Sequence, residues 1–278
     1  MQYPQELITS RQNPLIKLAA SLTERKFRER EGLFRFDGKK LLQEALDADL
    51  PLFAALWRQS SVETICAAMG ERELPEACRS VVLPDELFDR ISEEKSPEGV
   101  ICLSKHLDKW HKIATIDKRC VFLTEPPVGH TLLLESVRDP GNLGTIIRSA
   151  AAFGVGLVVL SSDCADLYHP RTLRAAMGTL FHTRVLVTED LAGVIGELKQ
   201  YGHVYAAALD ATATRLGEGS FGPLDAVVVG NEGHGLTPET IKACGHTVYI
   251  PMADGVESLN AGIAASVLLW ELYRGNRG

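Results

Sequence analysis

The sequence has no long apolar segment. Its longest nearly apolar run covers residues 261–270 and is interrupted by Ser266, about half of the roughly 20 residues that a membrane-spanning helix needs. Near Met1 there is no basic start followed by an apolar stretch and a small-residue cleavage site, which argues against a secretion signal. We therefore expect a soluble protein without a membrane partner.

Several signatures of reactive chemistry are also missing. The six cysteines never approach the C-x-x-C spacing of zinc or redox sites, so we expect reduced packing residues in the cytoplasm and no metal. The sequence contains no Walker A motif, no H-E-x-x-H and no G-x-S-x-G. The last absence removes the most common signature of hydrolases.

One glycine pattern needs separate treatment. Residues 217–222 match G-x-G-x-x-G, the fingerprint of nicotinamide-dependent oxidoreductases, which must follow a strand and open a helix. Here Pro223 and an expected strand at 226–229 come next. We interpret the match as a glycine-rich loop, and an oxidoreductase would require measurable binding of a nicotinamide cofactor.

The composition is that of a folded protein. Of the 278 residues, 45% are hydrophobic and 23% are charged, which is enough to bury a sizeable core and excludes disorder. At this length two domains, or one large domain with an extension, are expected. The apolar periodicity is interrupted at 108–112 and 125–129. We therefore predict domains at residues 1–112 and 118–278.

Both halves predict α/β structure. In the first half we expect helices at 13–27, 38–48, 61–69 and 84–91 and strands at 52–57, 80–83 and 100–104. In the second half we expect strands at 131–134, 157–160, 184–187, 204–209, 226–229 and 248–250, separated by helices. Continuous Val, Leu and Ile runs indicate strands buried on both faces, hence a parallel sheet. Ligands of such sheets bind beyond the carboxyl ends of the strands.

Charge is distributed unevenly along the chain. The net charge is -7, yet residues 1–40 carry +4 and the remainder carries -11. Such asymmetry is typical of a polyanion-binding arm on an acidic body, and the alternative is a solvated amphipathic helix. The candidate polyanion-binding residues are Arg11, Lys17, Arg25, Lys26, Arg28 and Arg30.

Three segments follow expected strands. After residue 134 come the turn D-P-G-N and a small-residue helix whose only charge is Arg148, which alone would fit an exposed helical arginine. After residue 229, three glycines in six residues let the backbone approach a flat ligand or another loop, although Glu232 could simply cap the helix that begins near Pro238. After residue 250, Ser258 or Asn260 can cap the terminal helix.

Together these segments form a specific set. The order is N-x-G-x-x-x-R at 142–148, G-N-E-G-x-G at 230–235, and I-P-M at 250–252 with E-S-L-N at 257–260. This set closely resembles the three motifs of the SpoU-like (TrmH-like) RNA 2′-O-ribose methyltransferases of the SPOUT superfamily. Residues 8–17 and 36–40 are similar to the S-x-x-N-x-x-I-K and F-x-x-E-G patterns of that family's substrate-binding domain. Asp37, where glutamate is usual, and Ala261, where valine is common, depart from the pattern.

The resemblance implies a C-terminal parallel-sheet SPOUT fold with a trefoil knot, a smaller N-terminal α/β substrate-binding domain and a homodimer. It also implies an S-adenosylmethionine site. By motif position the cofactor contacts are Leu209, Gly230, Glu232, Ile250, Met252 and Leu259. The catalytic residues are Asn142, Arg148, Glu232, Ser258 and Asn260.

The expected function is methyl transfer from S-adenosylmethionine to a ribose 2′-hydroxyl of RNA, with ribosomal RNA a better candidate than transfer RNA. The alternative is a non-catalytic RNA-binding paralogue associated with ribosomes. Retention of Asn142, Arg148, Glu232 and Asn260 together argues against that alternative.

Overall fold

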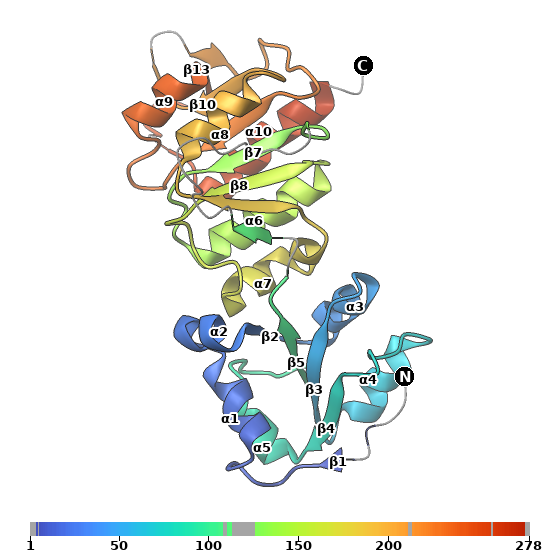
Figure 1. The fold of residues 1–278 in the computed structure, drawn as a ribbon. Coiled ribbons are helices and arrows are strands. Elements are labelled where there is room, and N and C mark those ends of the chain that lie inside the picture. The colour runs from blue at the N-terminus through green and yellow to red at the C-terminus, as the bar shows by residue number, and fades with distance from the viewer. Residues whose placement is uncertain are drawn as a thin grey trace. The chain divides into compact units, whose positions relative to one another are not determined.

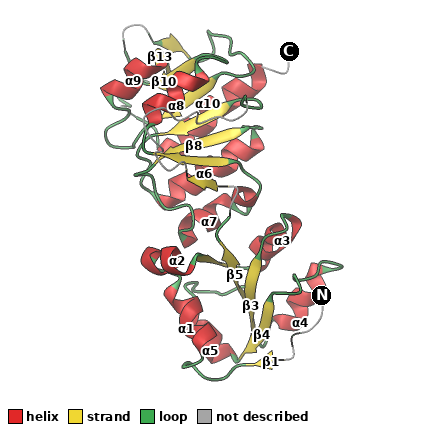
Figure 2. Ribbon diagram, viewed as in Figure 1, coloured by secondary structure: helices red, strands yellow, loops and turns green. Residues whose placement is uncertain are grey.

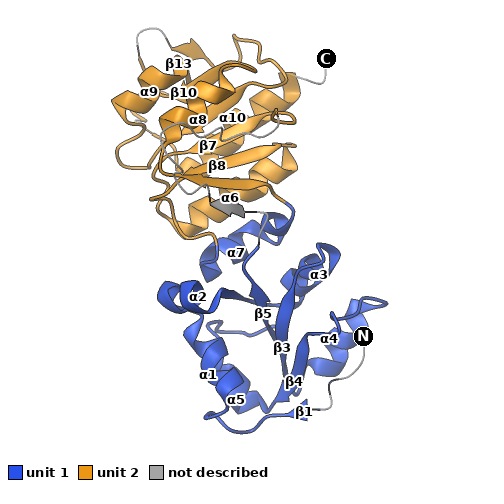
Figure 3. Ribbon diagram, in the orientation of Figure 1, with its two compact units in different colours: residues 1–107, 168–182 blue, residues 108–167, 183–278 orange. Residues whose placement is uncertain are grey.

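The structure is a computed structural model that describes residues 4, 6–107, 110–112, 126–210, 213–256 and 258–275. The chain divides into two compact units (Figure 3). Unit 1 comprises residues 1–107 and 168–182, and unit 2 comprises residues 108–167 and 183–278. The sequence-based boundary differs from this division in two places. Strand β6 (Trp110–Lys112) pairs with a strand of unit 2, and residues 168–182 belong to unit 1.

Unit 1 is built on a mixed sheet with the strand order β1-β4-β3-β5-β2 (Figure 1). On one face α1 and α5 contribute to a core of buried aliphatic side chains and Phe88. The strands are β1 (Glu6–Leu7), β2 (Leu33–Asp37), β3 (Leu52–Arg58), β4 (Arg79–Leu83) and β5 (Val100–Lys105). The helices are α1 (Pro14–Ser21), α2 (Arg25–Glu31), α3 (Lys39–Asp47), α4 (Val62–Met69), α5 (Asp85–Ile91), α7 (Pro170–Ala176) and the short 3-10 helix η1 (Thr179–Phe181).

The N-terminal region differs from the prediction. The expected helix at 13–27 is two helices, α1 and α2, and α2 ends at Glu31, before Gly32, whose φ of 63° lies in the left-handed region. The sequence did not predict β2 because Arg35 interrupts its apolar run. Arg35 is buried in that strand, where its guanidinium binds both carboxylate oxygens of Asp37 at 2.9 and 2.6 Å.

The returning segment 168–182 covers β2. Its aromatic rings pack on Phe34 and Phe36, with centroid distances of 4.6 Å from Phe34 to Tyr168 and 5.4 Å from Phe36 to Phe181. Phe34 and Phe36 are both buried. Because local composition says nothing about this return, the sequence assigned the segment to the second half.

Unit 2 is built on an eight-stranded sheet with the order β11-β13-β10-β12-β7-β8-β9-β6, and every pair in it is parallel. The other strands are β7 (Thr131–Leu134), β8 (Leu157–Ser161), β9 (Val185–Thr188), β10 (Val204–Ala207), β11 (Thr214–Arg215), β12 (Ala226–Val229) and β13 (Gly245–Tyr249). The helices are α6 (Pro140–Ala152), α8 (Leu191–Leu198), α9 (Pro238–Cys244) and α10 (Ala261–Gly275). The predicted parallel α/β architecture is confirmed.

Helices cover both faces of this sheet (Figure 2). Helices α8 and α9 pack on the face that carries Leu133, Val159 and Val228. Since successive side chains of a strand alternate between faces, the neighbouring strand residues face the opposite layer, where α6 and α10 pack together and α10 contacts β12. Residues 217–222 lead from β11 to β12 without an intervening helix, so the dinucleotide interpretation lacks its structural context.

None of the described helices combines the length and apolarity needed to cross a membrane. Among the described residues no group of three or more His, Cys, Asp and Glu could hold a metal ion.

The cysteines of the described ranges are free, and Cys120 lies outside those ranges. Burial raises the pKa of both Cys78 and Cys244 to about 12, which makes these two thiols poor nucleophiles.

Candidate active site

Three neighbouring strands of unit 2 end beside one cavity. Strands β13, β10 and β12 are consecutive and parallel, so their carboxyl ends lie at the same edge. The loops that follow them, with the start of α10, line an open cavity of about 370 Å³. That volume lies within the roughly 300–1,000 Å³ of small-molecule sites. The six residues predicted to contact the cofactor all line this cavity: Leu209, Gly230, Glu232, Ile250, Met252 and Leu259.

Gly230 lies where the loop after β12 doubles back on itself. A Cβ atom at this position would come within 2.4 Å of the Gly235 carbonyl and 2.6 Å of the Leu236 nitrogen. Asn231 and Gly235 exchange backbone hydrogen bonds of 3.1 and 2.9 Å. The lack of a side chain at Gly230 is therefore required by the other arm of the same loop.

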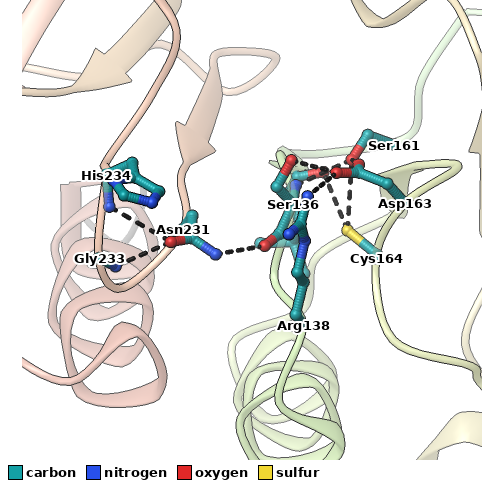
Figure 4. Close-up of polar contacts among 9 residues, drawn as sticks. Ser136, Arg138, Ser161, Asp163, Cys164, Asn231, Gly233 and His234 are labelled. Carbon is teal, nitrogen blue, oxygen red and sulfur yellow. Dashed lines mark hydrogen bonds and ion pairs between the residues drawn. The ribbon is translucent and has the colours of Figure 1, made fainter.

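Asn231 holds the turn of this loop from within and ties it to the β7 side of the sheet (Figure 4). Its side-chain oxygen accepts the N–H groups of Gly233 and His234 at 2.8 and 3.2 Å. Its amide nitrogen donates to the Ser136 carbonyl at 2.8 Å. The position of Glu232, between Asn231 and Gly233, therefore depends on Ser136.

Ser136 is itself held by the loop after β8. Its φ of 56° is uncommon for a residue with a side chain. Its N–H donates to the Ser161 hydroxyl at 2.9 Å, and its own hydroxyl donates to Asp163 at 2.5 Å. Burial raises the pKa of Asp163, but hydrogen bonds from Ser136, Ser161 and Arg138 outweigh this effect and leave that pKa below its ordinary value.

Glu135 fixes the end of the loop after β12, where that loop meets α9. Its buried carboxylate accepts hydrogen bonds from the backbone and hydroxyl of Thr237, at 2.8 and 2.9 Å, and from the Thr240 hydroxyl at 2.6 Å. Thr237 caps α9, accepting from the N–H of Thr240. The alternative in which Glu232 caps this helix is therefore wrong.

Three predicted catalytic side chains are directly connected. The Asn142 amide donates to Glu232 Oε1 at 2.6 Å, and the Asn260 amide donates to Asn142 Oδ1 at 3.0 Å. Asn142 lies in the first turn of α6, where Asp139 accepts its N–H at 2.8 Å. Helix α6 thus begins at Pro140, within the D-P-G-N segment that the sequence predicted as a turn. Of the two candidate caps of α10, Asn260 accepts the N–H groups of Gly262 and Ile263, at 2.9 and 3.3 Å.

The structure does not join the other two predicted catalytic residues to this chain. Ser258 is exposed and lines the cavity. Arg148 is exposed on α6, and we find no hydrogen bond or ion pair for it within the described residues. Its guanidinium is therefore available to a substrate.

The predicted RNA-binding residues divide into three groups. Arg11 and Lys17 are exposed. Three others are exposed but paired with acids, namely Arg25 with Glu29 at 2.8 Å, Lys26 with Glu24 at 3.0 Å and Arg30 with Glu31 at 2.7 Å. Arg28 is buried, and one of its guanidinium nitrogens donates to the carbonyls of Leu22 and Thr23 at 2.8 and 2.7 Å. The prediction of a phosphate contact at Arg28 is wrong because this side chain stabilises the junction of α1 and α2.

Sequence reasoning assigned no role to Ser136, Asp163, Glu135 or Asn231. Two of them left a signal. Glu135 is a charged residue directly after the three leucines of β7, and buried charges must be paired. Asn231 lies among glycines, where a side chain that bonds its own turn is common. The pairing of Ser136 with Asp163 joins two separate loops and left no local signal.

The fold and the cavity place the protein in the class of α/β proteins that bind a small molecule at the carboxyl edge of a parallel sheet. Within that class it is similar to solved RNA methyltransferases over nearly its whole length. A structure of an AdoMet-bound rRNA methyltransferase from Sinorhizobium meliloti has 26% identity, covers 98% of this chain and 99% of its own, and has a TM-score of 0.78. An RNA 2′-O ribose methyltransferase has 29% identity, coverage of 97% and 98%, and a TM-score of 0.77.

The particular family follows from the sequence models. Residues 129–270 match the SpoU rRNA Methylase family, and residues 13–102 match the MRM3-like substrate binding domain. The Bacillus subtilis 23S rRNA (guanosine(2553)-2′-O)-methyltransferase RlmP is 31% identical, with 95% of this chain and 98% of that protein covered. The chain belongs to the SpoU rRNA methylase family.

Proposed function

We propose that this protein transfers a methyl group from S-adenosylmethionine to a ribose 2′-hydroxyl of RNA, and that the RNA is ribosomal. The observation that carries the proposal is the hydrogen-bonded set of Asn142, Glu232 and Asn260, whose carboxylate lines the cavity. The similarity to RlmP supports ribosomal RNA as the substrate. The AdoMet-bound relative supports the cofactor.

The cavity has the chemistry that S-adenosylmethionine requires. Leu209, Ile250, Met252 and Leu259 provide apolar walls, which suit an adenine ring and a methylene chain. Residues at the ends of β10, β12 and β13 and in the loops that follow them line the same space, and their backbone groups can bind the polar edges of the ligand. The bound cofactor would supply an activated methyl group.

The side chains divide the work of the reaction. A 2′-hydroxyl is a poor nucleophile, so the site must hold its oxygen in line and stabilise the charge that develops on it. We assign both tasks to Arg148, because its guanidinium stays protonated and cannot act as a base. Asn142 and Asn260 orient the ribose, Glu232 organises the cofactor loop, and Ser258 lies beside the cofactor.

RNA contacts in unit 1 involve the exposed cations Arg11, Lys17, Arg25, Lys26 and Arg30. Exposed ion pairs are worth about 0–1 kcal/mol, so RNA phosphates can replace the partners of Arg25, Lys26 and Arg30. Such contacts carry affinity and salt dependence rather than sequence information.

A homodimer is the second part of the proposal. Ile263 and Trp270 on α10 are 55% and 51% exposed, and contiguous exposed apolar surface marks protein–protein interaction sites. Phe153 packs edge-on against Trp270 at 5.9 Å and extends this surface. Leu268, Leu269 and Leu272 are buried on the opposite side. A trefoil knot and a cytoplasmic location complete the proposal and are supported by family membership.

The decisive test of function is a map of RNA 2′-O-methylation in a deletion strain. We expect one ribosomal site to lose its methyl group and to regain it when the wild-type gene is returned. The non-catalytic alternative predicts an unchanged map. Complementation by Arg148→Ala would also contradict the assigned chemistry.

A further inference from the structure

A directional chain of hydrogen bonds starts at the first turn of α10. Asn260 Oδ1 accepts the backbone N–H groups of Gly262 and Ile263. A backbone N–H can only donate, so the cap fixes which end of the Asn260 amide faces the helix. Asn260 Nδ2 must therefore point away from α10.

The same logic fixes the next amide. Asn260 Nδ2 lies 3.0 Å from Asn142 Oδ1, and Asn142 Nδ2 lies 2.6 Å from Glu232 Oε1. A carboxylate accepts hydrogen bonds, so the acidic end of the chain demands the orientation that the helix cap imposes at the other end. Both amides are thus held by groups whose hydrogen-bonding roles cannot be exchanged.

In this arrangement one carboxylate oxygen of Glu232, Oε1, accepts the hydrogen bond from Asn142, and the other, Oε2, is left for a substrate. Within the described residues we find no hydrogen bond or ion pair for Glu232 Oε2, and the side chain is exposed at the cavity. Glu232 is the one carboxylate among the described residues that line this cavity, where Tyr249 is the other ionisable side chain. A phenol is protonated near neutral pH and cannot take a proton.

We propose that Glu232 Oε2 accepts the proton of the ribose 2′-hydroxyl and that Asn260, through Asn142, holds it in position. This inference rests on the proposed function and names the proton acceptor at the same site. The 2′ O–H bond breaks and its proton passes to Glu232, while the oxygen forms a bond to the methyl carbon. The electron pair of the breaking carbon–sulfur bond stays on sulfur, and Glu232 later returns the proton to solvent.

Glu232→Gln is the direct test, because glutamine keeps the shape and the hydrogen bond from Asn142 but cannot act as a base. We expect single-turnover methylation to fall about 10²–10⁴-fold, the usual contribution of general-base catalysis. We expect cofactor affinity by calorimetry and RNA affinity by fluorescence anisotropy to stay within threefold of wild type. A near wild-type rate would overturn the proposal, and so would lost cofactor binding, since that result assigns Glu232 to the loop alone.

Asn260→Asp tests the positioning role. Aspartate retains the cap oxygen, so thermal stability should be unchanged, but its second oxygen cannot donate to Asn142. We expect a rate loss of at least about tenfold and a shift of the Asn142 side-chain amide signal in the ¹⁵N NMR spectrum, which a purely structural cap would not produce. Asp190→Asn makes the reverse exchange at the N-cap of α8. It should leave both the methylation rate and the Asn142 amide signal unchanged.

An unaltered rate in Asn260→Asp would overturn the positioning role. If Asn260→Asp does not fold, Glu232→Gln still decides the identity of the base. A wild-type protein that binds no S-adenosylmethionine would instead refute the proposed function itself, which the calorimetry on wild type detects separately.

Discussion

The helices at the start of unit 1 and the loops at the carboxyl edge of unit 2 use their polar side chains in different ways. In α2 the basic side chains of Arg25, Lys26 and Arg30 already have acidic partners. In unit 2, by contrast, Arg148 is exposed without such a partner among the described residues, while the uncharged side chains of Asn142 and Asn260 are hydrogen-bonded to Glu232 and to each other. The number of charges in a segment is therefore a poor guide to what a ligand can reach. What decides it is whether each charged side chain already has a partner within the protein.

Outside the hydrogen-bonded set of Asn142, Glu232 and Asn260, Arg148 provides the largest expected effect. Arg148→Ala should lower single-turnover methylation about 10²–10³-fold, because a group that stabilises developing charge is worth that much. Arg148→Lys should also lose much of the rate, since an ammonium keeps the charge but loses the planar fork. Arg215→Ala, which removes an exposed arginine paired with Glu218, is the control and should methylate normally. Equal methylation rates for the alanine variants at 148 and 215 would show that an arginine without an acidic partner matters no more to the reaction than a paired one.

Gly230 tests the loop that presents Glu232. Gly230→Val should abolish detectable cofactor binding by calorimetry, because its Cβ would lie 2.4 Å from the Gly235 carbonyl. Gly196→Ala on α8 is the matched control, since no atom lies within 4 Å of its added Cβ. That change should raise stability by about 0.5–1 kcal/mol. Retained binding in Gly230→Val would show that the loop can open without loss of the site.

Arg28 sharpens the comparison within unit 1. Arg28→Ala should lower the free energy of unfolding by about 3 kcal/mol, because it removes the charged hydrogen bonds of a buried side chain to the carbonyls of Leu22 and Thr23. Arg30→Ala should change it by less than about 0.5 kcal/mol. Urea denaturation measures both. Similar values for the two variants would contradict the burial of Arg28.

The basic surface predicts a change in salt dependence. Alanine at Arg25, Lys26 and Arg30 together should reduce the slope of log K for RNA against log salt by about one for each lost phosphate contact. Cofactor affinity should not change. An unchanged slope would favour the solvated-helix interpretation of this segment and would leave Arg11 and Lys17 as the remaining candidates.

Asp163 provides the smallest effect. Its pKa is lowered from 3.8 in the folded protein, so its contribution to stability is present above about pH 4 and is lost as the pH falls through the lower folded value. Asp163→Asn should therefore flatten the loss of stability below about pH 4, as measured by urea midpoints across pH. A curve parallel to that of wild type would show that the cluster around Ser136 does not depend on this charge.

Sequence patterns predicted the elements of unit 2 better than those of unit 1. Buried parallel strands have continuous apolar runs, and glycine and asparagine mark turns by their backbone preferences. Most strands of unit 2 and the loops that line the cavity could therefore be predicted from the sequence. Strand β2 was missed because Arg35 is satisfied by Asp37 and by carbonyls of Ala19 and Ile91, which are distant in the sequence. Arg28 was misassigned for a different reason. Its partners are the nearby carbonyls of Leu22 and Thr23 at the junction of α1 and α2, and the sequence predicted one continuous helix there. For Arg35, partners that lie far apart in the chain allow the charge to be buried, and periodicity does not reveal them.

The return of residues 168–182 to unit 1 also has a consequence for biosynthesis. Phe34 and Phe36 are covered by Tyr168 and Phe181, which leave the ribosome after more than a hundred residues of intervening chain. Until then the nascent first unit carries an incomplete aromatic layer, and transiently exposed apolar surface of this kind invites misassembly. The unit that is translated first therefore becomes complete only after part of the second unit has been made.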